Sequence, residues 1–188
     1  MPDSPLILPY KGVLPRIGAG VFIAPGAVVI GDVEIGADCG IWFGAVVRGD
    51  VNEIRIGART NIQDGTIIHV SSGRVGKAPK LATYIGSDVT VGHKAVLHAC
   101  SIGDGAFIGM GATVMDGAVV EEGAMVAACA LVTPGKRVGS GQLWAGAPAR
   151  FVRRLGDDDR KSITDSVPHY CRLARTYLSA GIGRAEEI

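Results

Sequence analysis

The chain has 188 residues and a formal net charge of +1, and its composition is 47% hydrophobic but only 5% aromatic. This length allows one domain with a substantial core, and the small net charge gives no reason to expect nucleic acid or an anionic membrane as a partner. No apolar run reaches the length of a membrane span, and the prolines within residues 1–11 argue against a signal peptide. The four cysteines show no paired spacing, so we expect free thiols and a cytoplasmic protein.

Residues 1–16 are expected to form a lead-in, and a strict repeat follows them. An Ile, Val or Leu occupies every sixth position in four consecutive runs. The runs span 17–47, 56–68, 85–97 and 102–138. A period of six fits neither an α-helix nor a free strand, but it is typical of a triangular β-solenoid in which each short side buries one aliphatic residue. We therefore predict an all-β solenoid over residues 17–143.

Small residues accompany this repeat at two fixed offsets. At most coil starts a glycine directly follows the aliphatic residue, where a small residue suits a tight corner. These glycines are Gly18, Gly36, Gly57, Gly86 and Gly103. At the fourth position after the aliphatic residue the chain again has a small residue, most often alanine. Both offsets support a coil with narrow corners.

Two histidines fall in register when the predicted coils are stacked. His69 and His98 each follow the third aliphatic residue of their coil, which places them in one column on adjacent coils about 4.8 Å apart. Arg48 falls in the same column one coil earlier. Surface or core histidines without a ligand are the alternative, but two imidazoles so placed can bind one metal ion, and we favour that interpretation.

A third histidine, His93, lies two residues after the second aliphatic residue of its coil and so projects from another side of the triangle. It can join the other two if a neighbouring subunit supplies it, as in a three-fold homotrimer. Three neutral imidazoles with one open position are typical of catalytic Zn²⁺, although Co²⁺ or Fe²⁺ also fit. Cys100 is close in sequence, but strand alternation predicts a buried thiol there.

The chain after the repeat is interpreted as a connector over residues 144–156 and a C-terminal helical segment over 157–188. In this segment apolar side chains recur at helical spacing and should pack on the solenoid or on a neighbour. They are Tyr170, Leu173, Ala174, Tyr177 and Leu178. Because proline disrupts a helix interior, we expect Pro168 in the first turn of the helix, after a short turn near Asp157 to Asp165.

Several motifs lie at or near the three histidines and at the end of the repeat. They are Arg48-Gly49-Asp50, Asn61-Ile62-Gln63-Asp64, His69, Gly92-His93, Leu97-His98 and Trp144-Ala145-Gly146-Ala147-Pro148-Ala149. Together they resemble the γ-class carbonic anhydrases and related hexapeptide-repeat proteins, over nearly the whole chain. The resemblance implies a left-handed parallel β-helix with a C-terminal α-helix, and His69, His93 and His98 as the metal ligands.

The resemblance also implies roles for residues around the metal. Arg48 and Asp50 would bridge subunits, and Gln63 would be a polar partner of the metal-bound water. Asp64 shares the column of His93 one coil below, so Gln63 and Asp64 are expected to enter the site from the same subunit as His93. In relatives a tyrosine in a similar place approaches the metal, which makes Tyr170 a further catalytic candidate.

By this resemblance the protein is a lyase that hydrates carbon dioxide reversibly to bicarbonate, using hydroxide from metal-bound water. The sequence departs from the founding archaeal enzyme where glutamates assist proton transfer. Val51 directly follows the Arg-x-Asp motif, where that enzyme has a glutamate, and the insertion over residues 71–83 holds basic residues but no Asp or Glu. We therefore expect proton transfer to limit turnover.

Three other functions stay open at this point. They are a metal-dependent thioester hydrolase, a hexapeptide acyltransferase with a histidine base, and a non-catalytic trimeric scaffold that keeps its metal for assembly. The paired histidine column and its polar neighbours count against acyl transfer, which needs neither. Metal analysis separates the acyltransferase from the others, and carbon dioxide and thioester assays separate an enzyme from a scaffold.

Overall fold

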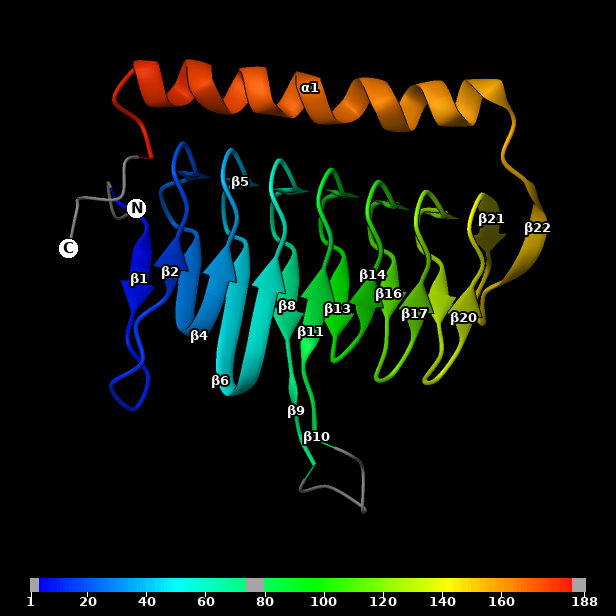
Figure 1. The fold of residues 1–188 in the computed structure, drawn as a ribbon, viewed down its shortest axis with the longest axis horizontal. Helices are drawn as coiled ribbons and strands as arrows, with labels where there is room; N and C mark the ends of the chain where they lie inside the picture. Colours follow the sequence, from blue (N-terminus) through cyan, green and yellow to red (C-terminus); the bar gives the residue numbers. More distant parts are fainter. Residues whose placement is uncertain (1–3, 74–79, 184–188) are drawn as a thin grey trace.

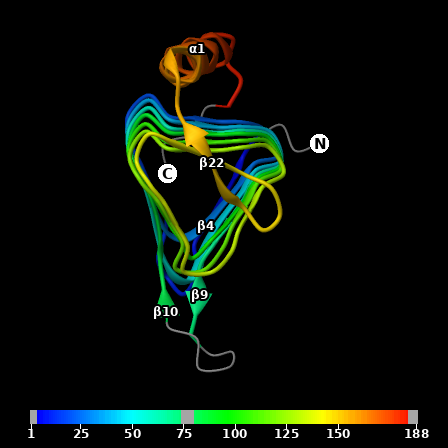
Figure 2. The ribbon, with the colours of Figure 1, turned by 90° about the vertical axis from the view of Figure 1, so that its right-hand side faces the viewer.

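The computed structural model describes residues 4–73 and 80–183, which form a left-handed parallel β-helix with one long α-helix along its side (Figure 1). Viewed along the solenoid axis, the coils superimpose as a triangle (Figure 2). The structure confirms the all-β solenoid with a C-terminal helix that the six-residue period predicts.

One side of the triangle is an eight-stranded sheet that lies beneath the α-helix (Figure 2), and we call it the helix face. Its strands are β3 (Phe22–Ile23), β5 (Gly40–Ile41), β7 (Asn61–Ile62), β12 (Thr90–Val91), β15 (Phe107–Ile108), β18 (Met125–Val126), β21 (Gln142–Ala145) and β22 (Arg150–Arg154). All of these pair in parallel except β22, which runs antiparallel to β21.

The other two sides belong to one twelve-stranded sheet, because two long strands, β4 (Val28–Ile35) and β6 (Val46–Ile56), run around the corner between them. The side that carries the histidine column, the histidine face, also contains β1 (Leu6–Leu8), β8 (Ile67–His69), β13 (Val96–His98), β16 (Thr113–Val114) and β19 (Leu131–Val132). The remaining side contains β2 (Arg16–Ile17), β11 (Thr83–Ile85), β14 (Ser101–Ile102), β17 (Val119–Val120) and β20 (Arg137–Val138). A separate antiparallel pair, β9 (Ser71–Ser72) and β10 (Lys80–Leu81), projects from the corner between these two sides (Figure 2).

The core lies inside the triangle and consists of the residues that the repeat predicts. Every aliphatic residue of the six-residue runs is buried except Ile17, which is partly buried and packs against the others. The alanines at the fourth position are buried too. Because apolar burial drives folding at roughly 25 cal/mol per Å², this continuous aliphatic column is what holds the coils together.

The coil-start glycines are required by close stacking rather than by the conformation of a corner. A Cβ built on Gly57 would lie 2.5 Å from the backbone nitrogen of Ser87 in the next coil, and one on Gly36 would lie 2.7 Å from that of Ala58. Neither glycine has a positive φ. A side chain at these positions would therefore push neighbouring coils apart.

The α-helix, α1 (Asp157–Ser179), is continuous through Pro168, so the expected short turn over residues 157–165 and the placement of Pro168 in a first turn are wrong. The helix starts where Gly156 N–H donates to Asp159 Oδ2 at 2.8 Å. Pro168 is exposed, whereas Val167 beside it is buried. A proline inside a helix costs about 3 kcal/mol, and packing of the apolar stripe on the solenoid offsets this cost.

That stripe contacts aromatic side chains of the first coils on the helix face. The rings of Phe22 and Tyr177 lie 5.3 Å apart between centroids, and those of Trp42 and Tyr170 lie 5.4 Å apart. Leu173, Ala174 and Leu178 belong to the same cluster. The predicted packing of the helix on the solenoid is thus confirmed.

Within residues 4–73 and 80–183, no helix is long and apolar enough to cross a membrane.

Candidate metal centre

His69 and His98 lie side by side at the ends of adjacent parallel strands. The register of β8 and β13 sets His69 directly opposite His98, as the stacking of coils predicts. Nδ1 of His69 is 3.3 Å from Nε2 of His98, and the ring centroids are 5.3 Å apart. The two imidazoles therefore turn one nitrogen each toward a common point.

The outer nitrogen of each imidazole binds a carboxylate. Nε2 of His69 donates to Asp50 Oδ1 at 2.9 Å, and Nδ1 of His98 donates to Asp116 Oδ1 at 2.6 Å. An ionised carboxylate only accepts hydrogen bonds, so each outer nitrogen carries a hydrogen. Such carboxylate partners orient histidines for metal binding.

The protonation of His69 and Asp50 suits this arrangement. Burial lowers the pKa of His69, and this effect outweighs the hydrogen bond to Asp50. Burial by itself raises the pKa of Asp50, but its hydrogen bonds to His69 and Arg48 bring that pKa below the usual value. A neutral imidazole beside an ionised carboxylate is the form that a metal requires.

His93 follows β12 on the helix face, separate from the paired histidines. Its Nδ1 is 2.7 Å from Asp64 Oδ2, which agrees with the predicted shared column of these two residues. Both side chains are about two-fifths exposed, at 40% and 43%. Within the described parts of the chain, no three His, Cys, Asp or Glu side chains are grouped so that they could hold a metal ion.

Gln63 lies in a buried polar network that starts at the helix. Its Nε2 donates to Asn61 Oδ1 at 3.0 Å, and Asn61 Nδ2 donates to Thr90 Oγ1 at 3.0 Å. The Thr90 hydroxyl is in turn 2.9 Å from that of Ser166 on α1. Gln63, Asn61 and Thr90 are at most 5% exposed, so these bonds fix the orientation of the Gln63 amide.

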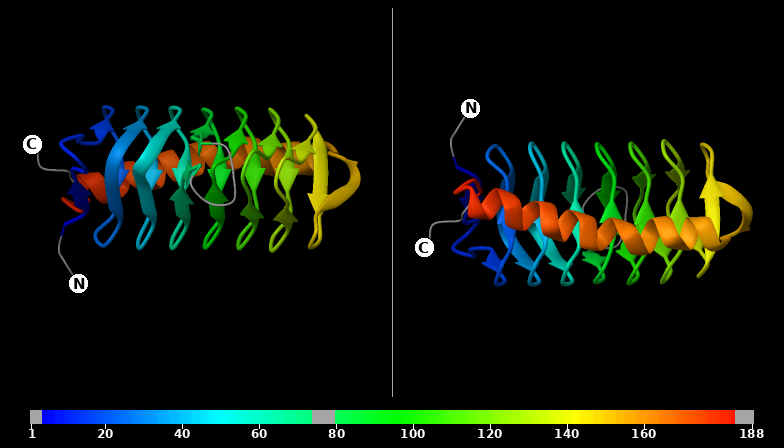
Figure 3. Two further views of the ribbon diagram at one scale, coloured as in Figure 1. Left: turned by 90° about the horizontal axis from the view of Figure 1, so that it is seen from below. Right: turned by 90° about the horizontal axis from the view of Figure 1, so that it is seen from above.

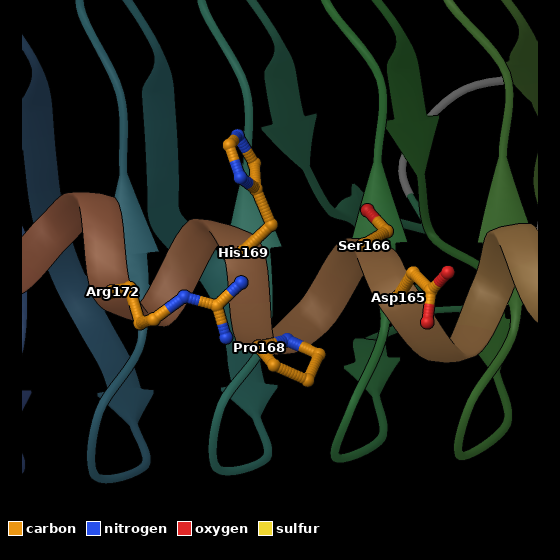
Figure 4. A pocket seen from close by; sticks show the side chains of 5 residues that line it. All are labelled: Asp165, Ser166, Pro168, His169 and Arg172. Atoms are coloured by element: carbon orange, nitrogen blue, oxygen red, sulfur yellow. The ribbon is translucent and has the colours of Figure 1, made fainter.

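Tyr170 lies on the same side of the solenoid as His93. It is half-buried against Trp42, and burial together with the charge of Asp64 raises its pKa above the usual value. The phenol is therefore neutral near pH 7. His169 is exposed and lines an open depression on α1 (Figure 4). The other residues that line this depression are Asp165, Ser166, Pro168 and Arg172. None of the candidate metal ligands lines that depression.

Arg48 and Asp50 pair within one chain. Nη1 of Arg48 donates to Asp50 Oδ2, while the other oxygen of Asp50 binds His69. Arg48 is 42% exposed and Asp50 only 16%. Val51, which follows them in β6, packs against the core. Residues 74–79 of the basic insertion lie outside the described residues.

Sequence reasoning missed Asp116 and Ser166. Ser166 precedes the buried Val167 on α1, and nothing in the sequence ties it to the solenoid. Cys100 is buried and all four cysteines are free, as predicted.

Comparisons with known proteins show the family of the chain. The family model "Bacterial transferase hexapeptide (six repeats)" matches residues 14–49 and 99–134. The chain is 49% identical over 175 residues to the mitochondrial gamma carbonic anhydrase 2 of Arabidopsis thaliana, covering 93% of this chain and 62% of that protein. It therefore spans less than two thirds of the length of that plant relative. It is 43% identical over 163 residues to a probable carbonic anhydrase of Methanocaldococcus jannaschii, covering 87% of this chain and 98% of that protein.

Among solved structures, the fold is similar to a hexapeptide transferase family protein from Anaplasma phagocytophilum. The TM-score is 0.85 at 47% identity, and the match covers 92% of this chain and 98% of the other. Repeat, fold and sequence identity agree over most of the length. The chain belongs to the γ-carbonic anhydrase family of hexapeptide-repeat proteins.

Proposed function

We propose that the protein is a zinc-dependent carbonic anhydrase that hydrates carbon dioxide reversibly at sites shared between the subunits of a homotrimer. The observation that carries the proposal is the pair of inner nitrogens on His69 and His98, 3.3 Å apart. Zinc bonds of about 2.0–2.1 Å in a tetrahedral site put two ligand nitrogens about 3.3–3.4 Å apart. The pair therefore fits two positions of such a site.

The third ligand in this proposal is His93 of a neighbouring subunit. His93 lies on the helix face and the pair lies on the histidine face, so a trimer would bring one subunit's His93 to the next subunit's pair. Exposed apolar residues at both positions support an interface. Ile67, two residues before His69, is 46% exposed, and Met110, in the coil after His93, is 57% exposed.

When bound, a divalent ion at this site would supply hydroxide near neutral pH for attack on carbon dioxide. The chain's own residues would orient the reactants and move the proton. The network through Asn61 binds Nε2 of Gln63, so the Oε1 of Gln63 would be left to accept a hydrogen bond from water at the centre. Asp64 and the neutral Tyr170 would lie beside that water, on the side contributed by His93.

Each hydration releases one proton, and the side chain of Val51 has no ionisable group that could accept it. We expect small diffusible buffers to raise the turnover number of zinc-loaded protein at saturating carbon dioxide by at least about tenfold, since a mobile base replaces the missing carboxylate. Stopped-flow hydration assays against imidazole concentration measure this effect, with His98→Ala as the control. A rate equal to that control at every buffer concentration would contradict the proposed activity.

Arg48 should contribute to assembly, because it is well exposed in the same column as the paired histidines. We expect Arg48→Ala to weaken the trimer while leaving the coil intact. Sedimentation at low protein concentration measures the first effect, and circular dichroism measures the second. An unchanged trimer would argue against an interface role for Arg48.

A second candidate function is acyl transfer, which is favoured by the similarity to the hexapeptide transferase family protein from Anaplasma phagocytophilum. Acyl transfer needs a single histidine base and no metal. Thioester hydrolysis at the same metal centre, or a metal-holding scaffold, would keep the zinc but lose the response to carbon dioxide. Metal analysis followed by carbon dioxide and thioester assays separates these functions.

We also propose a cytoplasmic location, based on the four free cysteines.

A further inference from the structure

One corner of the solenoid is a residue shorter than the corresponding corner of the next coil. From Leu97 the next aliphatic residue of the repeat, Ile102, comes after five positions instead of six. The next coil keeps the full spacing from Val114 to Val120, yet the strands on both sides of the corner stay paired. Ala99 in the shorter corner and Gly117 in the longer corner both have a positive φ, +50° and +67°.

This shortening changes which residue stands beside His98. Three residues connect Leu97 to Ser101, whereas four connect Val114 to Val119, so the longer corner presents one more residue to the shorter one. Gly117 N–H donates to Ala99 O at 2.7 Å, which moves Asp116 next to His98. The carboxylate of Asp116 thus reaches Nδ1 of His98 at 2.6 Å.

The bond fixes one of the two neutral forms of the imidazole. Because the carboxylate accepts, the hydrogen stays on Nδ1, and the lone pair of Nε2 points toward His69. Asp50 holds the outer nitrogen of His69 in the same way. The carboxylates of Asp50 and Asp116, which belong to different coils, therefore fix the orientation of the two imidazoles.

We propose that Asp116 is a positioning residue that presents Nε2 of His98 to the metal. This inference rests on the proposed function, since it assumes that the pair binds a metal. We expect Asp116→Ala to weaken zinc binding by about 10- to 100-fold, the usual effect of removing such a partner. Asp116→Asn should lose less, because its amide oxygen can still accept from Nδ1. Competition with a chromophoric chelator measures both affinities.

The matched control is Asp88→Asn. Asp88 also joins adjacent coils through its carboxylate, bound to Arg59 at 2.6 Å and 2.7 Å, but at a different corner. It should leave zinc affinity unchanged. Wild-type zinc affinity in Asp116→Ala would overturn the role of Asp116. Equal losses of zinc affinity in Asp116→Ala and Asp88→Asn, each in proportion to the loss of thermal stability, would overturn it too.

A second measurement separates this inference from the proposed function. In metal-free protein at about pH 8, where imidazole is neutral, nitrogen NMR should find the hydrogen of His98 on Nδ1 and find it redistributed to Nε2 in Asp116→Ala. An unchanged distribution would refute the positioning role. Absence of zinc from the wild-type protein, with this shift present, would refute the proposed function alone.

Discussion

A randomly assembled equimolar mixture of His69→Ala and His93→Ala chains should recover about one quarter of the wild-type zinc, although each variant alone should bind almost none. A site between subunits needs an intact pair from one chain and an intact His93 from the next. With random mixing, half of the chains supply each part, so about one site in four has both. Refolding an equimolar mixture and measuring zinc per trimer tests this expectation.

The control for this experiment uses two substitutions that both lie on the histidine face. A mixture of His69→Ala and His98→Ala chains should recover no zinc, because no chain then carries an intact pair. Verified heterotrimers of the first mixture that bind no more zinc than this control would contradict the shared site. A single chain would then have to supply all three ligands.

Gly57→Ala should destabilise the solenoid by at least about 3 kcal/mol, near the upper end of the usual cost of overpacking. The added methyl group would meet backbone and side-chain atoms of Ser87 at 2.5 Å and 2.6 Å, and backbone offers little room to move. Neighbouring coils would have to separate, which also weakens the hydrogen bond from Gly57 N–H to Ile85 O. Chemical denaturation followed by circular dichroism measures the loss.

Gly123→Ala is the comparison for this variant. Gly123 has a φ of +60°, but nothing lies within 4 Å of an added Cβ. Its substitution therefore costs only the strain of a left-handed conformation, about 1–2 kcal/mol. If the two variants lose equal stability, conformation and not close stacking governs the glycines of this fold.

The six-residue period was enough to predict the architecture and the histidine pair, because stacking turns sequence spacing into spatial position. His69 and His98 meet for this reason, and so do Asp64 and His93. The same counting could not find Asp116. It lies two residues after Val114, whereas His98 lies one residue after Leu97, and only the shortened corner brings them together.

Pro168 shows a different limit of sequence reasoning. Local preference places proline at a helix start, but the stripe from Val167 to Leu178 packs against the solenoid and keeps the helix continuous. Tertiary packing outweighed the local cost. The contact between Ser166 and Thr90 depends on that packing, so it could not be predicted from the sequence either.

The direction of α1 has a consequence for how the molecule unfolds. In a solenoid each repeat contacts only its neighbours, so terminal repeats can fray independently. Here the helix leaves the last coil and runs back over the whole length to the first (Figure 3). Near its end Arg175 binds Asp38 at 3.3 Å, and Ile23 N–H donates to Gly183 O at 3.5 Å. The first coils therefore cannot separate from the stack without detaching the helix, and we expect them to melt together with it rather than fray independently.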